Sequence, residues 1–258
     1  MIDTAEFAAV VRTDPVPLDL GCALIASCGR PTTDTASILG ALDEVAARCS
    51  SDHPGALCAE LFGNGTFRGD AVDYYDPRNS LLDEVLGRRV GIPITLSVVA
   101  IEVGRRIGVD LVGIGMPGHF LLRAAEDPEQ FFDPFHGGIA LDPVGCARLF
   151  EGMHRGQLRF EPEMLDITPP IVVLARILNN LRGAQVRRGD RGGLVRALAL
   201  QCALPGAGVA ERIELARMLR SVGELLDAAA VYDELAALDP VNEDEHERTA
   251  LRLRAQLN

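Results

Sequence analysis

The chain has 258 residues, of which 48% are hydrophobic, so it can bury the core of one large domain or of two smaller ones. Its formal net charge of −12 argues against binding to nucleic acids or to anionic membranes, because both present negative charge. No apolar run approaches the roughly 20 residues of a membrane span. The N-terminal stretch MIDTAEFAAVVRTDP also has acidic residues where a signal peptide needs its basic region. We therefore expect a cytoplasmic protein.

The six cysteines are scattered along the sequence without the spacing of a metal site. Cysteines of this kind in a cytoplasmic protein are usually reduced and buried. We expect neither a metal nor a cofactor.

The N-terminal part of the chain is predicted to be mainly helical. Apolar residues recur at helical spacing in residues 18–26 and 32–50, and Asp34 or Thr35 could cap the second of these helices. Residues 57–80 place Gly, Asn, Asp and Pro at turn positions, which indicates a loop-rich segment crossing the core.

Two further helices are predicted between residues 81 and 108. The segment LLDEVLGRR forms a short helix, and a longer one begins at Pro93, because proline is favoured at a first helical position. The longer helix, PITLSVVAIEVGRRIG, is apolar on nearly all sides up to Glu102. This pattern is typical of a helix buried in the middle of its domain.

Three short apolar runs then predict an antiparallel sheet. The runs VDLVGIGM, HFLLRAA and QFFDPF are separated by Pro-Gly and by the acidic turn EDPEQ. His119 and Asp133 would lie on two of these strands. GGIALD is a candidate for a further strand and PVGCARLFEGM for a helix.

After residue 170 the sequence shows only helical periodicity. The segment ELARMLRSVGELLDAAAVYDELAALDP resembles one helix–turn–helix unit of the tetratricopeptide type, with Gly223 at the turn, Ala228 at the helix contact and Pro240 at the end. The segment before it looks like a degenerate neighbour. Two such units need another surface to bury their apolar faces, so we expect them to pack on the N-terminal region.

The order of a buried helix, a strand with a histidine and a strand with an aspartate resembles the papain-like transglutaminase core. More closely, the chain resembles the bacterial SirB-type transglutaminase-like family. The resemblance is carried by YYDPRNSLLDEVLGRRVGIPITLSVVAIEVGRRIGV, GIGMPGHFLLR, FFDPFHGG and LARILNNLRGAQVRRGD. It implies an α+β transglutaminase-like domain with an antiparallel sheet over residues 1–168. It further implies an all-α region of tetratricopeptide-like helices over residues 169–258.

In the transglutaminase pattern, a cysteine at a helix N-terminus is the nucleophile, a histidine activates it and an aspartate orients the histidine. By position, the resemblance assigns the histidine to His119 and the aspartate to Asp133. Pro93 stands where the pattern has its cysteine. Because proline offers no nucleophile, the resemblance implies a degenerate triad.

Other residues could attack in place of the missing cysteine. Ser97 lies one turn further along the same helix and could use His119 as its base and Asp133 as the orienting group. Small buried serines more often bond to the carbonyl four residues earlier. Cys58 and Cys146 offer thiols but lie outside the matching helix. A hydrolase or acyl-transferase is therefore the alternative function.

The two histidines near the predicted cleft also have structural explanations. His119 could simply pair with Asp133 as a buried polar pair. His136, in DPFHGG, could be a second polar group at the cleft, but a solvated turn histidine is the simpler interpretation.

The remaining charged clusters have ordinary explanations. The aspartates of GDAVDYYD lack the spacing of a calcium-binding loop, so helix capping and loop solvation explain them better. The arginine pairs at 88–89 and 105–106 could bind a partner's carboxylate. Ion pairs with Asp83, Glu84 or Glu102 explain them more simply.

We therefore predict a non-catalytic, regulatory module with a protein or peptide as its partner. An enzyme needs a nucleophilic atom within roughly 3–4 Å of a His119 ring nitrogen. A binding module needs only an open groove. The geometry around His119 distinguishes the two functions.

Overall fold

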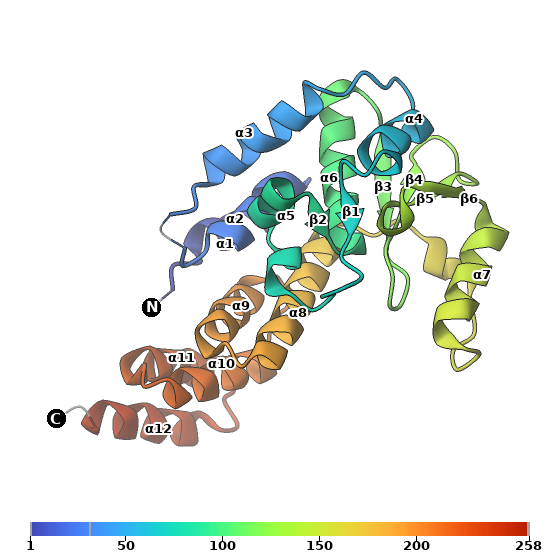
Figure 1. The fold of residues 1–258 in the computed structure, drawn as a ribbon. Coiled ribbons are helices and arrows are strands. Elements are labelled where there is room, and N and C mark those ends of the chain that lie inside the picture. The colour runs from blue at the N-terminus through green and yellow to red at the C-terminus, as the bar shows by residue number, and fades with distance from the viewer. Residues whose placement is uncertain (1, 31, 257–258) are drawn as a thin grey trace.

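A computed structural model describes residues 2–30 and 32–256 of the chain. Helices make up most of it, and a small sheet lies to one side (Figure 1). The α-helices are α1 (Ala5–Val10), α2 (Leu18–Ser27), α3 (Thr35–Ala46), α4 (Pro54–Cys58), α5 (Leu82–Arg88), α6 (Pro93–Ile107), α7 (Pro143–His154), α8 (Pro170–Arg188), α9 (Arg191–Ala203), α10 (Val209–Ser221), α11 (Leu225–Leu238) and α12 (Glu243–Ala255). Within the described residues, no helix is both long enough and apolar enough to cross a membrane.

The predicted antiparallel sheet is confirmed, and GGIALD contributes its fourth strand. Its strands β3 (Leu111–Ile114), β4 (Leu121–Ala124), β5 (Phe131–Asp133) and β6 (Ile139–Leu141) pair in that order. A separate parallel pair joins β1 (Arg68–Gly69) to β2 (Val90–Gly91). The α+β fold class is therefore the one that the sequence predicts.

The sheet lies between α6 and α7. Successive side chains of a strand point to opposite faces, so each face of the sheet packs against a different helix. Leu122 and Phe132, which are partners in the β4–β5 register, join the main core around α6. Leu121 and Phe131 face the other way and pack with Phe150 of α7 in a smaller cluster. His119, just before β4, and Asp133, at the end of β5, are thus held between two hydrophobic layers.

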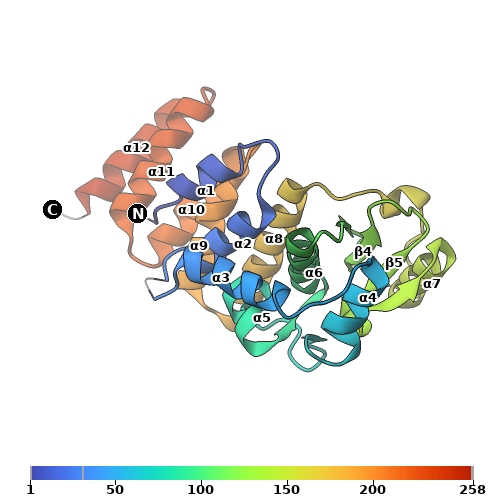
Figure 2. The ribbon, with the colours of Figure 1, turned by 90° about the horizontal axis from the view of Figure 1, so that it is seen from above.

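Helix α6 is the central element, as its apolar sequence predicts. Its residues from Pro93 to Ala100 are all buried, and Figure 2 shows the helix between the helical half of the molecule and the sheet. Gly104 lets the following loop approach closely, since a Cβ there would lie 2.3 Å from the Val109 carbonyl oxygen. Gly108, with φ of +79°, ends the helix in the left-handed conformation that glycine adopts without strain.

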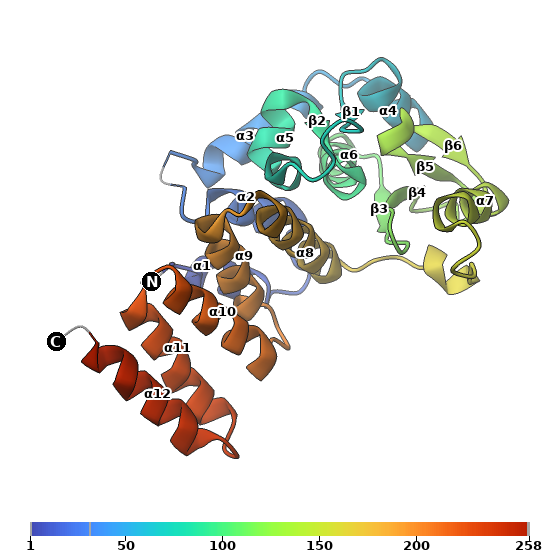
Figure 3. The same cartoon turned by 60° about the horizontal axis from the view of Figure 1, so that its bottom comes forward.

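The C-terminal region is helical throughout its described residues, and α8 packs against α2 (Figure 3). Leu174 of α8 belongs to the same core as Ala23 of α2, as expected for helices that need another surface. The predicted helical hairpin is formed by α10 and α11, with Gly223 at φ +87° in the turn and Ala228 fully buried. The boundary between residues 168 and 169 remains a prediction.

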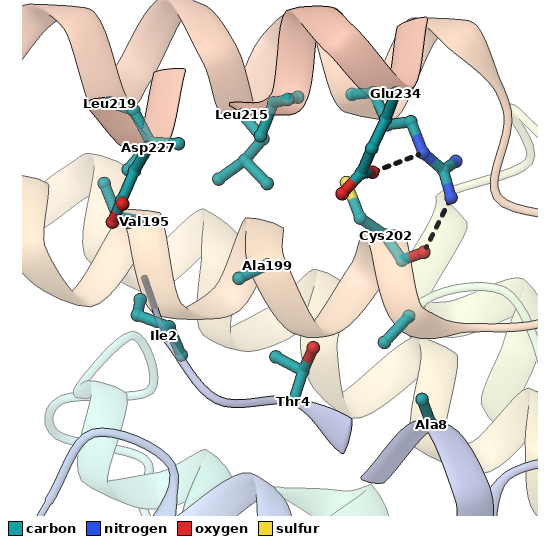
Figure 4. A pocket seen from close by; sticks show the side chains of 13 residues that line it. Ile2, Thr4, Ala8, Val195, Ala199, Cys202, Leu215, Leu219, Asp227 and Glu234 are labelled. Carbon is teal, nitrogen blue, oxygen red and sulfur yellow. Dashed lines mark hydrogen bonds and ion pairs between the residues drawn. The ribbon is translucent and has the colours of Figure 1, made fainter. Parts of the chain in front are cut away.

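The N-terminal segment lies against this helical region. Ile2, Thr4 and Ala8 line a pocket of about 160 Å³ whose opposite walls come from α9, α10 and α11 (Figure 4). Arg212 also lines this pocket and contacts Glu234 and the Cys202 carbonyl oxygen.

Part of the predicted loop at residues 57–80 is helical instead. Helix α4 continues into a π-helix, Ala59–Gly63, and Pro77–Ser80 forms a 3-10 helix. Leu61 and Phe62 are buried in the main core. Tertiary burial of these apolar side chains therefore outweighs the turn-forming residues around them.

Candidate functional site

His119 and Asp133 face each other across the end of the sheet. Asp133 is the last residue of β5, and its Oδ2 lies 2.9 Å from His119 Nε2. The prediction that His119 lies on a strand is wrong, because β4 begins only at Leu121. The Pro117-Gly118 turn, in which Gly118 has φ of +76°, delays the strand and leaves His119 in the loop before it.

His136 belongs to the same cluster. Its Nδ1 lies 2.7 Å from the Asp133 oxygen that also contacts His119, although half of its side chain is exposed. The interpretation of His136 as a purely solvated turn residue is therefore wrong. The DPF segment bends into the 3-10 helix Pro134–His136, which brings the imidazole back over the end of β5.

Asp133 is fully buried, and its four hydrogen bonds explain how its charge is held. Its Oδ1 accepts the backbone N–H groups of Phe135 and His136, and its Oδ2 contacts both imidazoles. Burial alone would raise the pKa of Asp133, but the hydrogen bonds and charges of His119 and His136 outweigh burial and lower it. Asp133 is therefore a carboxylate that orients two histidines.

The same three side chains are spaced as metal ligands could be. The ligand atoms of His119, Asp133 and His136 all lie within 4.8 Å of one another. Two imidazoles and a carboxylate are a donor set that suits zinc and similar metals. The hydrogen bonds to Asp133 already explain the positions of both rings, so the cluster does not require a metal.

Pro93 and His119 line one pocket of about 130 Å³, which opens at the N-terminus of α6. Pro93 is the first residue of that helix, where the resemblance places a nucleophile. Ser97 is fully buried, and its hydroxyl donates to the Pro93 carbonyl oxygen at 2.9 Å rather than to His119. The serine therefore makes the local bond that is usual for buried helical serines.

The two candidate thiols are not brought to His119 either. Cys58 and Cys146 are both fully buried, and burial is the largest of the effects that raise the pKa of each thiol to about 12. Among the described residues, neither sulfur makes a hydrogen bond to His119. At neutral pH both thiols are protonated, so they are poor nucleophiles.

The loop before α5 contributes Tyr74 to the pocket that His119 also lines. Tyr74 lines the pocket and stacks edge-on against Phe135, with ring centroids 6.0 Å apart. Asn79 fixes this loop by donating to Asp70 at 3.0 Å and to the Asp73 carbonyl oxygen at 2.9 Å. Asp70 thus accepts hydrogen bonds within the loop, and Asp76 caps the 3-10 helix Pro77–Ser80 by accepting the Arg78 N–H, in line with the predicted helix capping.

Arg176 of α8 holds the loop that carries His119. Its guanidinium donates to the carbonyl oxygens of Gly115 at 2.6 Å, Met116 at 2.7 Å and His119 at 3.1 Å. It also lines the pocket, together with Asn180 one turn further along the helix. Helix α8, from the C-terminal region, thus supplies part of the site.

Sequence reasoning singled out neither Arg176 nor Asn180 as a site residue. Both lie in the motif LARILNN, which was noted only for its resemblance to a family. A single arginine inside the apolar run PIVVLARIL was the available signal, because charged residues on a buried helix face are normally paired or functional.

The arginine pairs are explained largely by ion pairs, as predicted. Arg105 and Arg106 both bind Glu102, at 2.9 and 3.0 Å, and both also reach Asp19. The predicted pairs with Asp83 and Glu84 are not formed by the 88–89 arginines, because Arg30 occupies those two carboxylates instead. Arg88 lies 3.6 Å from Asp70, and Arg89 stacks over Phe67 with its guanidinium 4.6 Å from the ring centroid.

Comparison with curated proteins finds relatives in bacteria and in mammals. A UPF0162 protein of Xylella fastidiosa strain Temecula1 is 42% identical over 137 residues, which cover 51% of this chain and 49% of that protein. A UPF0162 protein of Vibrio cholerae is 34% identical over 139 residues, or 53% of this chain and 49% of that protein. F-box only protein 21 of Mus musculus is 31% identical over 138 residues, or 50% of this chain but 21% of that protein.

The chain thus spans about half the length, or less, of the curated relatives that it matches. No solved structure matches it. A family model described as the transglutaminase-like superfamily matches residues 36–179, which is more than half of the chain and includes Pro93, His119, Asp133 and Arg176. The chain belongs to the transglutaminase-like superfamily.

Proposed function

We propose that this chain is a transglutaminase-like protein without a nucleophile, and that its pocket binds a protein or peptide partner instead of catalysing a reaction. The observation that carries this proposal is the pairing of Pro93 with His119 in one pocket. An imidazole oriented by a buried carboxylate is the acid–base half of a nucleophilic mechanism. The position that the family resemblance gives to the thiol is occupied by Pro93, whose ring offers no nucleophile for the imidazole to activate.

The surroundings of the other candidate nucleophiles support the non-catalytic part of the proposal. The Ser97 hydroxyl is engaged by the Pro93 carbonyl oxygen and is sealed from solvent. The thiols of Cys58 and Cys146 are buried and have a pKa of about 12. A serine or cysteine mechanism would require one of these atoms to approach within hydrogen-bond distance of His119.

The pocket itself supports the binding part of the proposal. It combines an aromatic ring, Tyr74, with polar groups from His119, Arg176 and Asn180, which is typical of a recognition site. The matched segment is about half of the bacterial relatives but about a fifth of F-box only protein 21. Matches of similar length thus occur in proteins of very different size, as is usual for a recognition module.

The C-terminal helices extend the proposed binding surface. We propose that residues 169–258 are a region of tetratricopeptide-like helices beside the domain at 1–168, and that the protein acts in the cytoplasm. Stacked helical hairpins present extended surfaces that bind other proteins. Through Arg176 and Asn180, α8 contributes to the pocket as well as to this surface.

The proposal is tested by selecting binders from a randomised library of N-acetylated octapeptides on immobilised protein. Wild type is compared with Asn180→Phe, which places a large ring at an exposed position on the pocket wall, and with His119→Ala. Val172→Phe is the matched control, because Val172 is 43% exposed on the same helix and does not line the pocket. We expect wild type and Val172→Phe to select the same peptides and the other two variants to lose them.

Treating each protein with a fluorophosphonate or iodoacetamide probe tests the non-catalytic part. We expect no labelling that depends on His119. His119-dependent labelling of Ser97, Cys58 or Cys146 would instead establish a hydrolase or acyl-transferase. Retention of every selected peptide by Asn180→Phe would exclude the pocket as the binding site.

A further inference from the structure

Arg176 is a partly buried cation whose charge no carboxylate neutralises among the described residues. Its three hydrogen bonds go to the backbone carbonyl oxygens of Gly115, Met116 and His119, which are neutral. Burial lowers the pKa of Arg176, and the Tyr74 hydroxyl is the only group that raises it. Buried charges in proteins are normally paired, because an uncompensated charge is costly away from water. This guanidinium therefore lacks an anion.

The N-terminus of α6 also favours an anionic ligand. Ile94 lines the pocket, and as the second residue of a 15-residue helix its N–H has no partner within that helix. Among the described residues, no other acceptor binds this N–H. The positive end of the helix dipole and the Arg176 guanidinium thus meet at one small pocket.

His119 supplies the third feature of the pocket. Its side chain is only 5% exposed, and Nε2 is engaged by Asp133. The other ring nitrogen, Nδ1, makes no hydrogen bond to any described residue. Nδ1 therefore keeps its hydrogen-bonding capacity for a polar group of a ligand.

We propose that this pocket binds a carboxylate group of the partner, held by Arg176 and the Ile94 amide beside His119; the proposal rests on the binding function proposed above. A single guanidinium matches the charge and fork geometry of one carboxylate. Phosphate recognition in peptides instead relies on clusters of arginines. The net charge of −12 also disfavours a more highly charged ligand.

Three small probes test the chemistry directly and identify the source of the carboxylate. N-acetylglycylglycine represents a peptide C-terminus, and N-acetylaspartate α-amide represents an acidic side chain. N-acetylglycylglycinamide is the uncharged control. Each is titrated into the full chain while the NMR signals of the His119 ring and the Arg176 guanidinium are followed, with assignments from His119→Gln and Arg176→Gln.

We expect one or both carboxylates to shift these signals saturably and to bind at least tenfold more tightly than the amide. Asn180→Phe, with an unchanged fold by circular dichroism, should weaken the carboxylate at least tenfold, and Val172→Phe should leave it unchanged. The carboxylate probe that binds more tightly shows whether the partner supplies the carboxylate from its C-terminus or from an acidic side chain.

Equal binding of carboxylate and amide would overturn the proposal, as would carboxylate binding that Asn180→Phe does not weaken. Tighter binding of inorganic phosphate than of either carboxylate would overturn it too. If octapeptides are still selected through the pocket but show no preference for a carboxylate, this inference fails while the proposed binding function stands. If no peptide depends on the pocket, both fail.

Discussion

The two ends of helix α6 place arginine side chains in opposite electrostatic surroundings. At the C-terminal end, Arg105 and Arg106 share Glu102 and Asp19 at distances of 2.7 to 3.0 Å. At the N-terminal end, the hydrogen bonds of Arg176 to described residues all go to backbone carbonyl oxygens, and its guanidinium lies 5.4 Å from the Phe120 ring centroid. Arg106 and Arg176 are both partly buried, so the difference between these two lies in charge compensation rather than in burial.

This contrast separates a structural use of arginine from a functional one. Cations near a helix C-terminus are favoured by the helix dipole, and paired carboxylates reduce their desolvation cost. A cation at the N-terminus is opposed by the dipole and has no carboxylate to compensate it. Such an arrangement persists at a functional site because an anionic ligand completes it.

The largest loss of stability is expected at the C-terminal end of α6, where carboxylates pair with the arginines. Glu102→Ala removes a carboxylate that is 3% exposed and leaves two arginines short of a partner. We expect the free energy of unfolding to fall by about 3 kcal/mol, because Arg106, whose side chain is only 14% exposed, loses a buried partner. Urea unfolding followed by circular dichroism measures it.

The matched control is Glu44→Ala, whose carboxylate pairs with Arg48 at 3.6 Å on the exposed surface of α3. Exposed pairs of this kind contribute about 0.5 kcal/mol or less. Equal losses in the two variants would show that burial of the Glu102 cluster has no energetic consequence.

A smaller loss of stability is expected at the N-terminal end of α6, where no described carboxylate pairs with Arg176. Arg176→Gln removes hydrogen bonds to neutral acceptors but also removes an unpaired buried charge. We expect a net loss of about 1–2 kcal/mol, below that of Glu102→Ala, together with loss of carboxylate binding. Urea unfolding in the absence of ligand measures the first quantity. A loss as large as that of Glu102→Ala would mean that Arg176 is compensated after all.

The two ends should also respond to acid in opposite directions. Burial raises the pKa of Glu102 above its ordinary value of 4.5, so its contribution to stability is present below pH 4.5 and is lost as the pH rises through the folded-state pKa. The pKa of Asp133 is lowered, against burial, by His119 and His136. Its contribution is present above pH 3.8 and is lost as the pH falls through the folded-state pKa.

Urea unfolding at several pH values between 2 and 7 separates these two contributions. We expect Asp133→Asn to flatten the stability profile below pH 3.8 and Glu102→Gln to flatten it above pH 4.5. Profiles that are parallel to wild type in both variants would contradict the two pKa directions.

The smallest effect is expected for Ser97→Ala. The substitution removes one hydrogen bond, from the Ser97 hydroxyl to the Pro93 carbonyl oxygen. We expect a loss of about 1 kcal/mol or less and unchanged binding of the selected octapeptides and of the carboxylate probes. Loss of an activity shown by wild type would identify Ser97 as a nucleophile.

The sequence predicts α6 and the sheet well because both follow from local apolar periodicity. The hairpin at Gly223 is predictable for a similar reason, since a glycine between two amphipathic segments marks a tight turn. The partner of His119 also follows from the sequence, through the order of motifs that the family resemblance supplies.

The rest of the site depends on contacts between segments that are distant in sequence. Arg176 reaches the His119 loop across 57 residues, and no local pattern specifies which helix packs there. His136 lies at the turn that DPFHGG predicts, but the sequence did not indicate that the 3-10 geometry of this turn brings its ring to Asp133. Tertiary packing, rather than local preference, decides both contacts.

The placement of Pro93 in the position of the missing nucleophile is tested most directly by introducing a thiol there with Pro93→Cys. At the N-terminus of α6 and beside His119, the new thiol should have a lowered pKa, while Cys58 and Cys146, with a pKa of about 12, stay unreactive as internal references. We predict that iodoacetamide at pH 7 alkylates the introduced thiol roughly tenfold faster than free cysteine, and that adding His119→Ala removes this acceleration. An alkylation rate equal to that of free cysteine and unaffected by His119→Ala would contradict the placement of Pro93 in the position of the missing nucleophile.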